Sequence, residues 1–417
     1  MRENGRIAFT VILILSAVTG IRVLAALTGS PRGGSDPTPQ GVKLLWMSST
    51  VGGVREVLIT SGGEYVTAGG KGFVKRMEAG TGKETWSIER PLQVDSMAEA
   101  GDGSIVLAGL EQARLWAIKG DGSICWELST EGPVLALDLT GRGDKAVFGT
   151  FFGTLYFAYP MRREVEAIHR REGAAVIRAA LSADGDTAAI GYSDDAVEGF
   201  KWGDPEPIWH VRVEGHPKVL AFSPEGDRLI LGTDNGRLYA LDPRNGETLW
   251  VFEAADAISC VEFLEEDSMA VGSHDGYVYL INLEDGSNPW RYKVEGAVKS
   301  MAYIRNGSIL CIGGTDRRFR ALDLDAGMEL GSVKAGYWVT SISASENGIA
   351  AFGAGKTLYT VRITVEGGGE HPSPGGGELS QPRKNLVYGA SIILPALGAA
   401  GYLLVKHRRD KKGSSKP

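Results

Sequence analysis

One short pattern recurs through most of this 417-residue chain: an apolar run that ends in a glycine. It is found as YVTAG, IVLAG, AVFG, AAIG, LILG, MAVG, ILCIG and AAFG, and successive glycines are 40 to 42 residues apart. The eight glycines are Gly69, Gly109, Gly149, Gly191, Gly232, Gly272, Gly313 and Gly353. A fixed period of this length is typical of repeat architectures, in which each unit packs against its neighbours.

A series of tryptophans keeps the same period as the glycines. It comprises Trp46, Trp86, Trp126, Trp209, Trp250 and Trp290, and Ile168 and Leu330 occupy the two remaining positions. Two series that stay in phase along the chain indicate eight repeats of one structural unit.

Each repeat contains four short runs that have the composition of strands. In residues 218–250 the runs KVLAFS, RLILG, RLYALD and ETLW are separated by the turns PEGD, DNG and RNG. Aliphatic and aromatic runs of this length, bounded by Gly, Asp and Asn, favour short antiparallel strands. Four strands in every forty residues predict one blade of a β-propeller. We therefore predict an all-β, eight-bladed β-propeller of four-stranded blades over residues 42–365.

The two ends of the repeat region complement each other. The last repeat, from Val333 to Val365, supplies only three strand-like runs, whereas the run Val42–Ser48 precedes the first full repeat. Pairing of this N-terminal strand with the last repeat would close the ring and leave no sheet edge unpaired there. Seven blades are the alternative if one of the weaker repeats is irregular.

The repeats resemble those of the pyrroloquinoline-quinone-like (PQQ-like) propeller family. The segments TGKETW and NGETLW, and the pattern Ala240, Asp242, Asn245, Gly246 and Trp250, carry the resemblance. It implies that each tryptophan docks between adjacent blades. The stretch from Gly215 to Gly236 is also similar to a WD-repeat, although the chain has no Trp-Asp dipeptide.

The resemblance raises the question of enzymatic activity. Quinoprotein dehydrogenases of this family hold a quinone and Ca²⁺ over the channel, and many have a disulfide between adjacent cysteines. This chain has no adjacent cysteines, no long insertions in its repeats and no C-x-x-C-H haem motif. We therefore expect no cofactor, no metal site and no catalytic residue, as in the non-enzymatic branch of the family, whose propellers are docking platforms.

The segments that flank the repeats point to a membrane. Residues 1–30 have the pattern of a signal peptide or an N-terminal membrane anchor, and both alternatives stay open. Residues 366–385 are rich in Gly, Pro and Ser and predict a stalk, and the uncharged residues 386–405 have the length of a transmembrane helix. Residues 406–417 are basic, which predicts a cytoplasmic tail and a propeller outside the cytoplasm at the cell membrane.

One face of the predicted ring carries aromatic and charged residues in its turns. The candidates for contact with a partner are Phe151, Phe152, His274, Asp275, Arg317, Arg318, Tyr337 and Trp338. Aromatic residues and arginines are enriched in protein interfaces. The alternatives are that Trp338 and the phenylalanines plug the channel or pack between blades, and that His274 beside Asp275 belongs to an ordinary polar turn or acts as a metal ligand or a general base.

The preferred interpretation of function is a non-catalytic scaffold that binds a protein or another component of the cell envelope. The net charge is −7, and the segment between the basic termini carries −14, which disfavours nucleic acid as a partner. The alternatives are a sensor that acts through a membrane partner and a quinone- or metal-dependent dehydrogenase.

Overall fold

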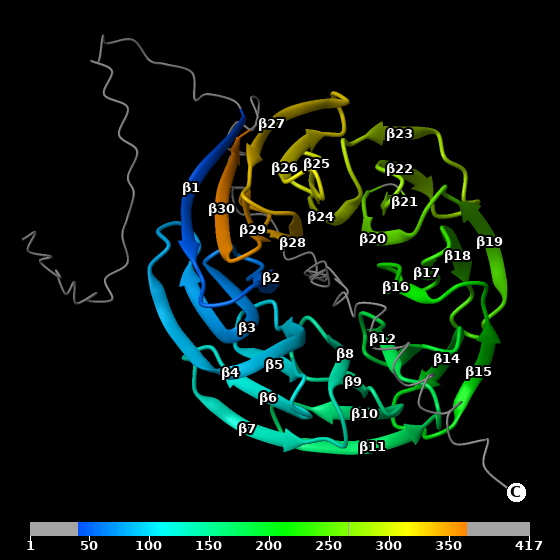
Figure 1. The fold of residues 1–417 in the computed structure, drawn as a ribbon. Coiled ribbons are helices and arrows are strands. Elements are labelled where there is room, and N and C mark those ends of the chain that lie inside the picture. The colour runs from blue at the N-terminus through cyan, green and yellow to red at the C-terminus, as the bar shows by residue number, and fades with distance from the viewer. Residues whose placement is uncertain (1–40, 266, 365–417) are drawn as a thin grey trace, which may run out of the picture. The chain divides into compact units, whose positions relative to one another are not determined.

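The computed structural model describes residues 41–265 and 267–364, which form 30 β-strands arranged as a ring of sheets (Figure 1). In each four-stranded sheet one strand lies near the ring axis and the other strands lie progressively further out, and the six-stranded sheet contributes two strands near the axis. The strands nearest the axis are β2, the second half of β4, β8, β12, β16, β20, β24 and β28. We call these the inner strands.

The bounds of the strands follow the predicted repeats. The first sheet in chain order holds β2 (Val54–Ile59), β3 (Tyr65–Glu78), β4 (Glu84–Glu99), β5 (Ile105–Leu110), β6 (Arg114–Lys119) and β7 (Ile124–Ser129). The next three are β8 (Val134–Leu139), β9 (Ala146–Thr150), β10 (Thr154–Tyr159) and β11 (Glu164–Arg170); β12 (Val176–Leu181), β13 (Thr187–Tyr192), β14 (Ala196–Lys201) and β15 (Pro207–Arg212); and β16 (Pro217–Phe222), β17 (Leu229–Thr233), β18 (Arg237–Leu241) and β19 (Thr248–Glu253). The last three are β20 (Ile258–Phe263), β21 (Ser268–Ser273), β22 (Tyr277–Asn282) and β23 (Trp290–Lys293); β24 (Val298–Ile304), β25 (Ile309–Gly314), β26 (Arg318–Asp323) and β27 (Met328–Lys334); and β28 (Val339–Ala344), β29 (Ile349–Ala354) and β30 (Thr357–Thr364) with β1 (Gly41–Ser49).

The predicted count of eight blades is wrong, because the described strands form seven hydrogen-bonded sheets, six of four strands and one of six. The first two sequence repeats share the 16-residue strand β4. Its first half pairs with β3 and its second half pairs with β5. The connection between these repeats stays extended, and Gln93 pairs with Lys71 of β3, so that no break separates the two repeats.

The predicted helices at the two termini are also absent from the fold that the structure describes. Residues 41–265 and 267–364 contain no helix, and therefore none that is long and apolar enough to cross a membrane. The segments predicted at residues 1–30 and 386–405 lie outside the described residues.

The ring is closed by the N-terminal strand, as predicted. Strand β1 pairs antiparallel with β30, from Gly41 opposite Thr364 to Ser49 opposite Thr357, and becomes the outermost strand of that sheet. The sheet therefore combines the first and the last strands of the described chain.

The recurrent glycines allow neighbouring sheets to pack closely. A Cβ atom on Gly149 of β9 would lie 2.1 Å from the side chain of Val176, the first residue of the next inner strand. At Gly232 the corresponding distance to Ile258 would be 2.5 Å. A larger residue at these positions would push the sheets apart, which explains the 40-residue period of glycine.

The tryptophans join successive repeats, as the family resemblance implies. The indole nitrogens of Trp46, Trp86, Trp126, Trp209 and Trp250 each donate a hydrogen bond of 2.7 to 3.0 Å to a backbone carbonyl 33 or 34 residues further on. Each such ring buries apolar area and satisfies its one polar atom at the same contact.

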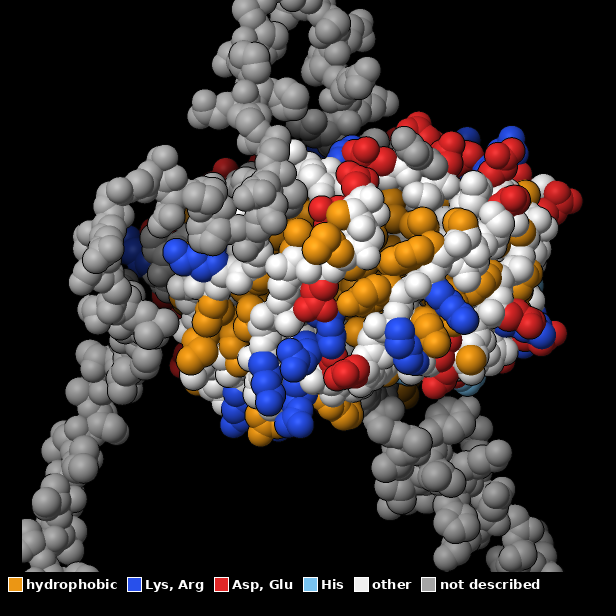
Figure 2. All heavy atoms as spheres, turned by 90° about the horizontal axis from the view of Figure 1, so that it is seen from above, with side chains coloured by type: hydrophobic (Ala, Val, Ile, Leu, Met, Phe, Trp, Pro, Cys, Tyr) orange, Lys and Arg blue, Asp and Glu red, His pale blue; other side chains and the backbone are white. Residues whose placement is uncertain are grey.

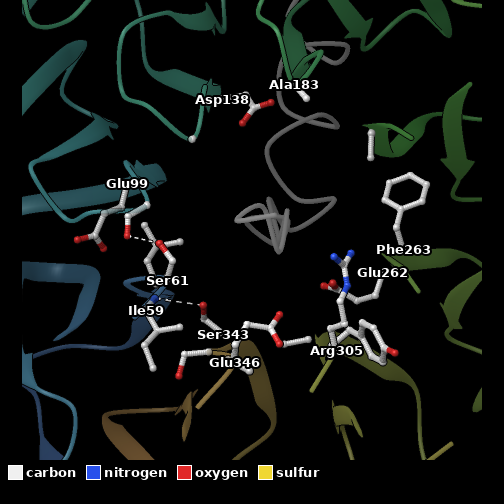
Figure 3. A pocket seen from close by; sticks show the side chains of 18 of the residues that line it. Ile59, Ser61, Glu99, Asp138, Ala183, Glu262, Phe263, Arg305, Ser343 and Glu346 are labelled. Carbon is white, nitrogen blue, oxygen red and sulfur yellow. Dashed lines mark hydrogen bonds between the residues drawn. The ribbon is translucent and has the colours of Figure 1, made fainter. Parts of the chain in front are cut away.

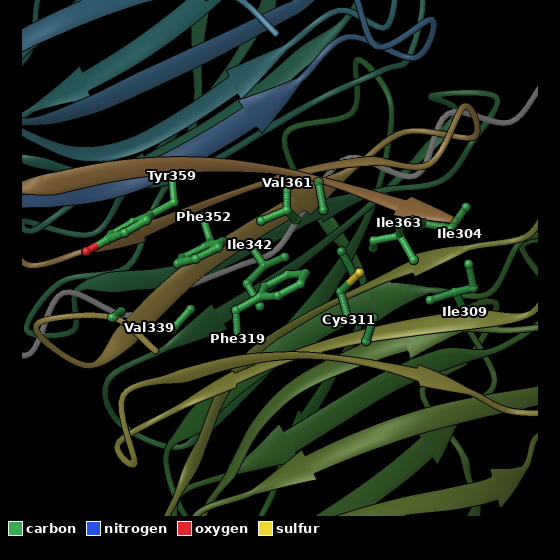
Figure 4. Close-up of a cluster of buried hydrophobic side chains, with 14 of the residues drawn as sticks. Ile304, Ile309, Cys311, Phe319, Val339, Ile342, Phe352, Tyr359, Val361 and Ile363 are labelled. Atoms are coloured by element: carbon green, nitrogen blue, oxygen red, sulfur yellow. The ribbon is translucent and has the colours of Figure 1, made fainter. Parts of the chain in front are cut away.

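The hydrophobic core is divided into clusters that lie between adjacent repeats. Figure 4 shows the cluster at the closing sheet, where Phe319 of β26 stacks on Phe352 of β29 at a ring-centroid distance of 4.8 Å. Tyr359 of β30 stacks on the other side of Phe352 at 4.7 Å. These contacts join the last two sheets, so that packing as well as hydrogen bonding stabilises the ring.

Candidate binding sites at the two ends of the channel

The inner strands surround a channel, and one end of it opens into a cavity of about 1070 Å³ (Figure 3). The last residues of the inner strands and the turns that follow them line this cavity. Its acidic side chains are Glu99, Asp138, Glu262, Glu265 and Glu346, and its basic side chain is Arg305. We call this end of the ring the cavity end.

Asp138 and Glu262 point into the cavity from different sides. The backbone N–H groups of Leu139 and Leu181 each donate a hydrogen bond of 2.8 Å to the carboxylate of Asp138, yet burial raises its pKa to about 6. Burial also raises the pKa of Glu262 to about 8, against a smaller opposite effect of a backbone hydrogen bond at Tyr303. At pH 7 Glu262 therefore holds a proton that an ordinary carboxyl group has lost, whereas Asp138 stays protonated only at mildly acidic pH.

The other acidic residues of the cavity have partners in the protein. Glu99 turns away from the cavity and forms a buried ion pair with Arg76 of β3. Glu265 lies 3.3 Å from the Nε atom of Arg305, and Glu346 accepts a hydrogen bond of 3.0 Å from the backbone of Asn306.

At the opposite end of the channel, four basic side chains lie close to one another, whereas Arg55 of β2 at the same level pairs with Asp95. The four are Arg178 of β12, Lys218 of β16, Lys299 of β24 and His274 of the turn between β21 and β22, and we call them the cationic cluster. The Nζ atom of Lys299 lies 2.8 Å from Nε2 of His274. Burial and then the charge of Lys299 lower the pKa of His274, so that its neutral ring can accept this hydrogen bond.

All eight sequence-predicted contact residues lie at this same end of the ring, opposite the cavity. The strand pairing establishes it: Thr150, which precedes Phe151, is paired with the first residue of β8, and Ser273, which precedes His274, is paired with the first residue of β20. Arg317 and Arg318 lie in and directly after the turn from β25 to β26, and Tyr337 and Trp338 precede β28. The eight residues share one end but are distributed over four sheets.

The aromatic members of this set are exposed. Phe151, Phe152, Tyr337 and Trp338 have 48%, 50%, 67% and 56% of their surface accessible. The alternative that these rings are buried between blades is therefore wrong. Phe151 and Phe152 contact each other edge to face, with ring centroids 5.4 Å apart. We call this end of the ring the aromatic end.

Asp275 and Arg318 form local hydrogen bonds, whereas Arg317 is exposed. The carboxylate of Asp275 accepts a hydrogen bond of 2.6 Å from the hydroxyl of Tyr279 and one of 2.9 Å from the backbone of Tyr277. Arg317 is exposed and adopts a positive φ of 63°, and the backbone of Arg318 donates to Asp316. His274 and Asp275 thus occupy an ordered polar turn, and only His274 joins the cationic cluster.

Several charged residues of the inner strands were not predicted as site residues. Asp138 and Glu262 occupy the fifth position of their strands, and Lys218 and Lys299 occupy the second. A charged residue at the same position of several apolar runs, as in VLALDL and ISCVEF, could have indicated in the sequence that these side chains line the channel. Among residues 41–265 and 267–364, no group of three or more His, Cys, Asp or Glu side chains is arranged to hold a metal ion.

Comparison with solved structures supports the fold. The chain is similar to the computationally designed Ika8 protein, with a TM-score of 0.67 and 18% identity, over 78% of this chain and 100% of the other. It is also similar to the C-terminal WD40 domain of Sif2, with a TM-score of 0.69 and 15% identity, over 79% of this chain and 100% of the other.

Comparison with known sequences identifies the family. The chain is 22% identical to the outer membrane protein assembly factor BamB of Burkholderia pseudomallei (strain K96243) over 57% of its length and 68% of that protein. It is 25% identical to the BamB protein of Yersinia pestis over 43% of its length and 39% of that protein. A family model described as outer membrane protein assembly factor BamB matches residues 21–200 and 234–362, which is more than half of the chain. The chain therefore belongs to this family of PQQ-like repeat propellers.

Proposed function

We propose that this protein is a non-catalytic docking propeller that binds another protein of the cell envelope through the aromatic end of its ring. The observation that carries the proposal is the exposure of Phe151, Phe152, Tyr337 and Trp338, each between 48% and 67% accessible at that end. Large aromatic side chains are enriched in protein interfaces because they bury much area at a small cost in conformational entropy. The family relationship to assembly factors supports a partner that is itself a protein.

The test is site-specific photo-crosslinking in cells that produce the full-length protein. A photo-reactive residue at position 152 or 338 should give a discrete adduct with a partner protein. The matched controls are positions 161 and 328, because Met161 and Met328 are exposed to 61% and 57% but lie in or directly after turns at the cavity end. Adducts of equal yield from both ends, or from the control positions alone, would contradict docking through the aromatic end.

We also propose that the propeller lies outside the cytoplasm and is attached to a membrane by the uncharged residues 386–405, with residues 406–417 on the cytoplasmic side. The charge pattern of the flanking segments supports this arrangement. A Phe152→Cys variant should react with a membrane-impermeant maleimide in intact cells whose outer envelope has been removed. Reaction of this variant only after lysis would contradict the location.

A further inference from the structure

Two members of the cationic cluster, Lys218 and Lys299, lie at β-bulges of their strands. The pairing of β16 with β17 passes from Pro217 to Val219, and that of β24 with β25 passes from Val298 to Ser300. Lys218 and Lys299 are therefore the bulged residues of their strands. The other inner strands show the same shift, so this β-bulge is a feature of the repeat, and at β16 and β24 the extra residue is a lysine.

The groups of the cluster are linked to one another. The Nε atom of Arg178 donates to the backbone carbonyl of Lys218, and its Nη1 atom donates to the carbonyl of Ile177. Burial lowers the pKa of Lys218, and the charges of Arg178 and Lys299 lower it further. These like charges are therefore close enough to repel one another.

The protein does not neutralise these charges by direct contact. None of the ion pairs formed among the described residues includes Arg178, Lys218 or Lys299. Arg178 is only 2% exposed, and its Nη2 atom has no hydrogen-bond partner in the described part of the chain. A buried guanidinium nitrogen without an acceptor is costly, and an anion from outside would supply one.

The surrounding carboxyl groups limit the charge that the cluster can accept. Several carboxyl groups lie near the cluster, each beyond ion-pair distance, and their negative charge favours the protonated form of its members. Glu56 has this effect on Arg178, and Asp234 has it on Lys218. Asp256 has it on both Lys299 and His274. Asp275 also acts on His274. These groups would repel a doubly charged phosphate more strongly than a singly charged carboxylate.

We propose that the cationic cluster binds a carboxylate of the docked protein partner, so that an acidic segment of the partner enters the channel at the aromatic end. Arg178, Lys218 and Lys299 supply the hydrogen-bond donors and the charge. Lys218 and Lys299 are only partly buried, so that an acidic side chain can reach them from solvent. This inference rests on the proposed function, because it names the chemistry of the partner that docks there.

The experiment measures binding of a fluorescently labelled hexaglutamate peptide to the purified full-length protein at constant ionic strength. The wild type should bind the peptide, and the Lys218→Met, Lys299→Met double variant should bind it at least tenfold more weakly. The matched control is the Lys71→Met, Lys334→Met double variant, because both residues are exposed and β-sheet pairing places them at the aromatic end. This control should bind within threefold of the wild type.

The outcomes separate the two proposals. The methionine variants keep the side-chain stems, and a thermal melting point at or above that of the wild type establishes that the double variant folds. Equal binding by the wild type and the Lys218→Met, Lys299→Met variant would overturn the carboxylate site, as would complete displacement of the peptide by an equal concentration of inorganic phosphate. A partner adduct at positions 152 and 338 together with either of these results would leave docking intact and remove only the carboxylate site.

Discussion

The two ends of the channel are formed by the same ring of inner strands, but they carry opposite charge. At the cavity end, Asp138 and Glu262 point inward and burial raises the pKa of both. At the aromatic end, Lys218 and Lys299 occupy bulged positions and burial lowers their pKa. The fifth and the second positions of the inner strands thus lie at opposite ends of the channel, and desolvation disfavours the charged form of these side chains at both ends.

The outer surface differs from both ends of the channel. Figure 2 shows one side of the molecule, on which hydrophobic side chains lie among acidic and basic ones. The exposed hydrophobic residues of the outermost strands include Met47 of β1 and Val251 of β19. Scattered residues of this kind are normal on protein surfaces, whereas the two aromatic pairs lie at the same end of the ring.

The largest expected effect on stability is at a tryptophan that joins neighbouring repeats, and it tests whether both ends of the channel depend on these contacts. Trp209 is 7% exposed and donates a hydrogen bond of 2.7 Å to the carbonyl of Pro243 in the next repeat. Trp209→Ala should lower the free energy of unfolding by about 3 to 4 kcal/mol, because a large buried ring and a hydrogen bond are lost. Chemical denaturation monitored by circular dichroism measures this effect. A loss below about 1 kcal/mol would indicate that the repeats are stable without this connection.

The second prediction concerns the cavity end. The pKa of Glu262 is raised from 4.5 to about 8 in the folded protein, so the folded state binds this proton more tightly than the unfolded state. The associated stability is complete below pH 4.5 and is lost as the pH rises through about 8. Glu262→Gln should abolish this loss and be more stable than the wild type at pH 9, by about 2 kcal/mol or more at 1.4 kcal/mol per pKa unit. A difference in the free energy of unfolding between the two proteins that stays constant from pH 5 to pH 9 would contradict this prediction.

The third prediction concerns the aromatic end, where the free energy of unfolding should depend on pH in the opposite direction. The pKa of Lys299 is lowered from 10.5 by burial, so the folded state releases this proton more readily than the unfolded state. Its unfavourable contribution is present at neutral pH and disappears as the pH rises towards 10.5. Because the side chain is partly solvated, Lys299→Met should stabilise the protein at pH 7 by only about 0.5 to 1 kcal/mol. Urea denaturation at pH 7 and pH 10 measures the difference, which should shrink at the higher pH.

The smallest effect on stability is expected at an exposed aromatic residue. Phe152 is 50% exposed, so Phe152→Ala should change the free energy of unfolding by less than about 0.5 kcal/mol. If the aromatic end is the docking surface, the same substitution should reduce partner capture strongly, as measured by photo-crosslinking from position 338. Met161→Ala at the cavity end is the control. Reduced stability together with unchanged capture would assign Phe152 a structural role.

The sequence predicted the repeat because glycine and tryptophan act at fixed contacts between neighbouring units. Gly149 must approach Val176, and each docking tryptophan must reach a carbonyl in the next repeat, so both residue types recur with the period of the fold. The number of sheets could not be predicted in this way. It depends on whether the connection after Glu89 stays extended beside Lys71, and no change of periodicity marks that difference.

The candidate site was only partly predictable. Turn residues such as Phe152 and Trp338 could be assigned to one end of the ring, because strand order determines which turns lie together. The directions of Lys218 and Lys299 depend on bulges, which shift the alternation of a strand by one residue. The burial of Asp138 and Glu262 depends on how the inner strands surround the channel, which no single repeat reveals.

The closure of the ring by β1 has consequences for folding and for mechanical load. The last ladder joins Gly41 to Thr364, which are 323 residues apart, so a ribosome must release almost the whole propeller before the ring can close. Contacts of such long range slow folding and leave two sheet edges open in the meantime. The chain also enters and leaves the ring at this one pair. A force that pulls the two flanking segments apart would therefore separate β1 from β30 one residue pair at a time, whereas a force that moves both segments together would not separate these two strands.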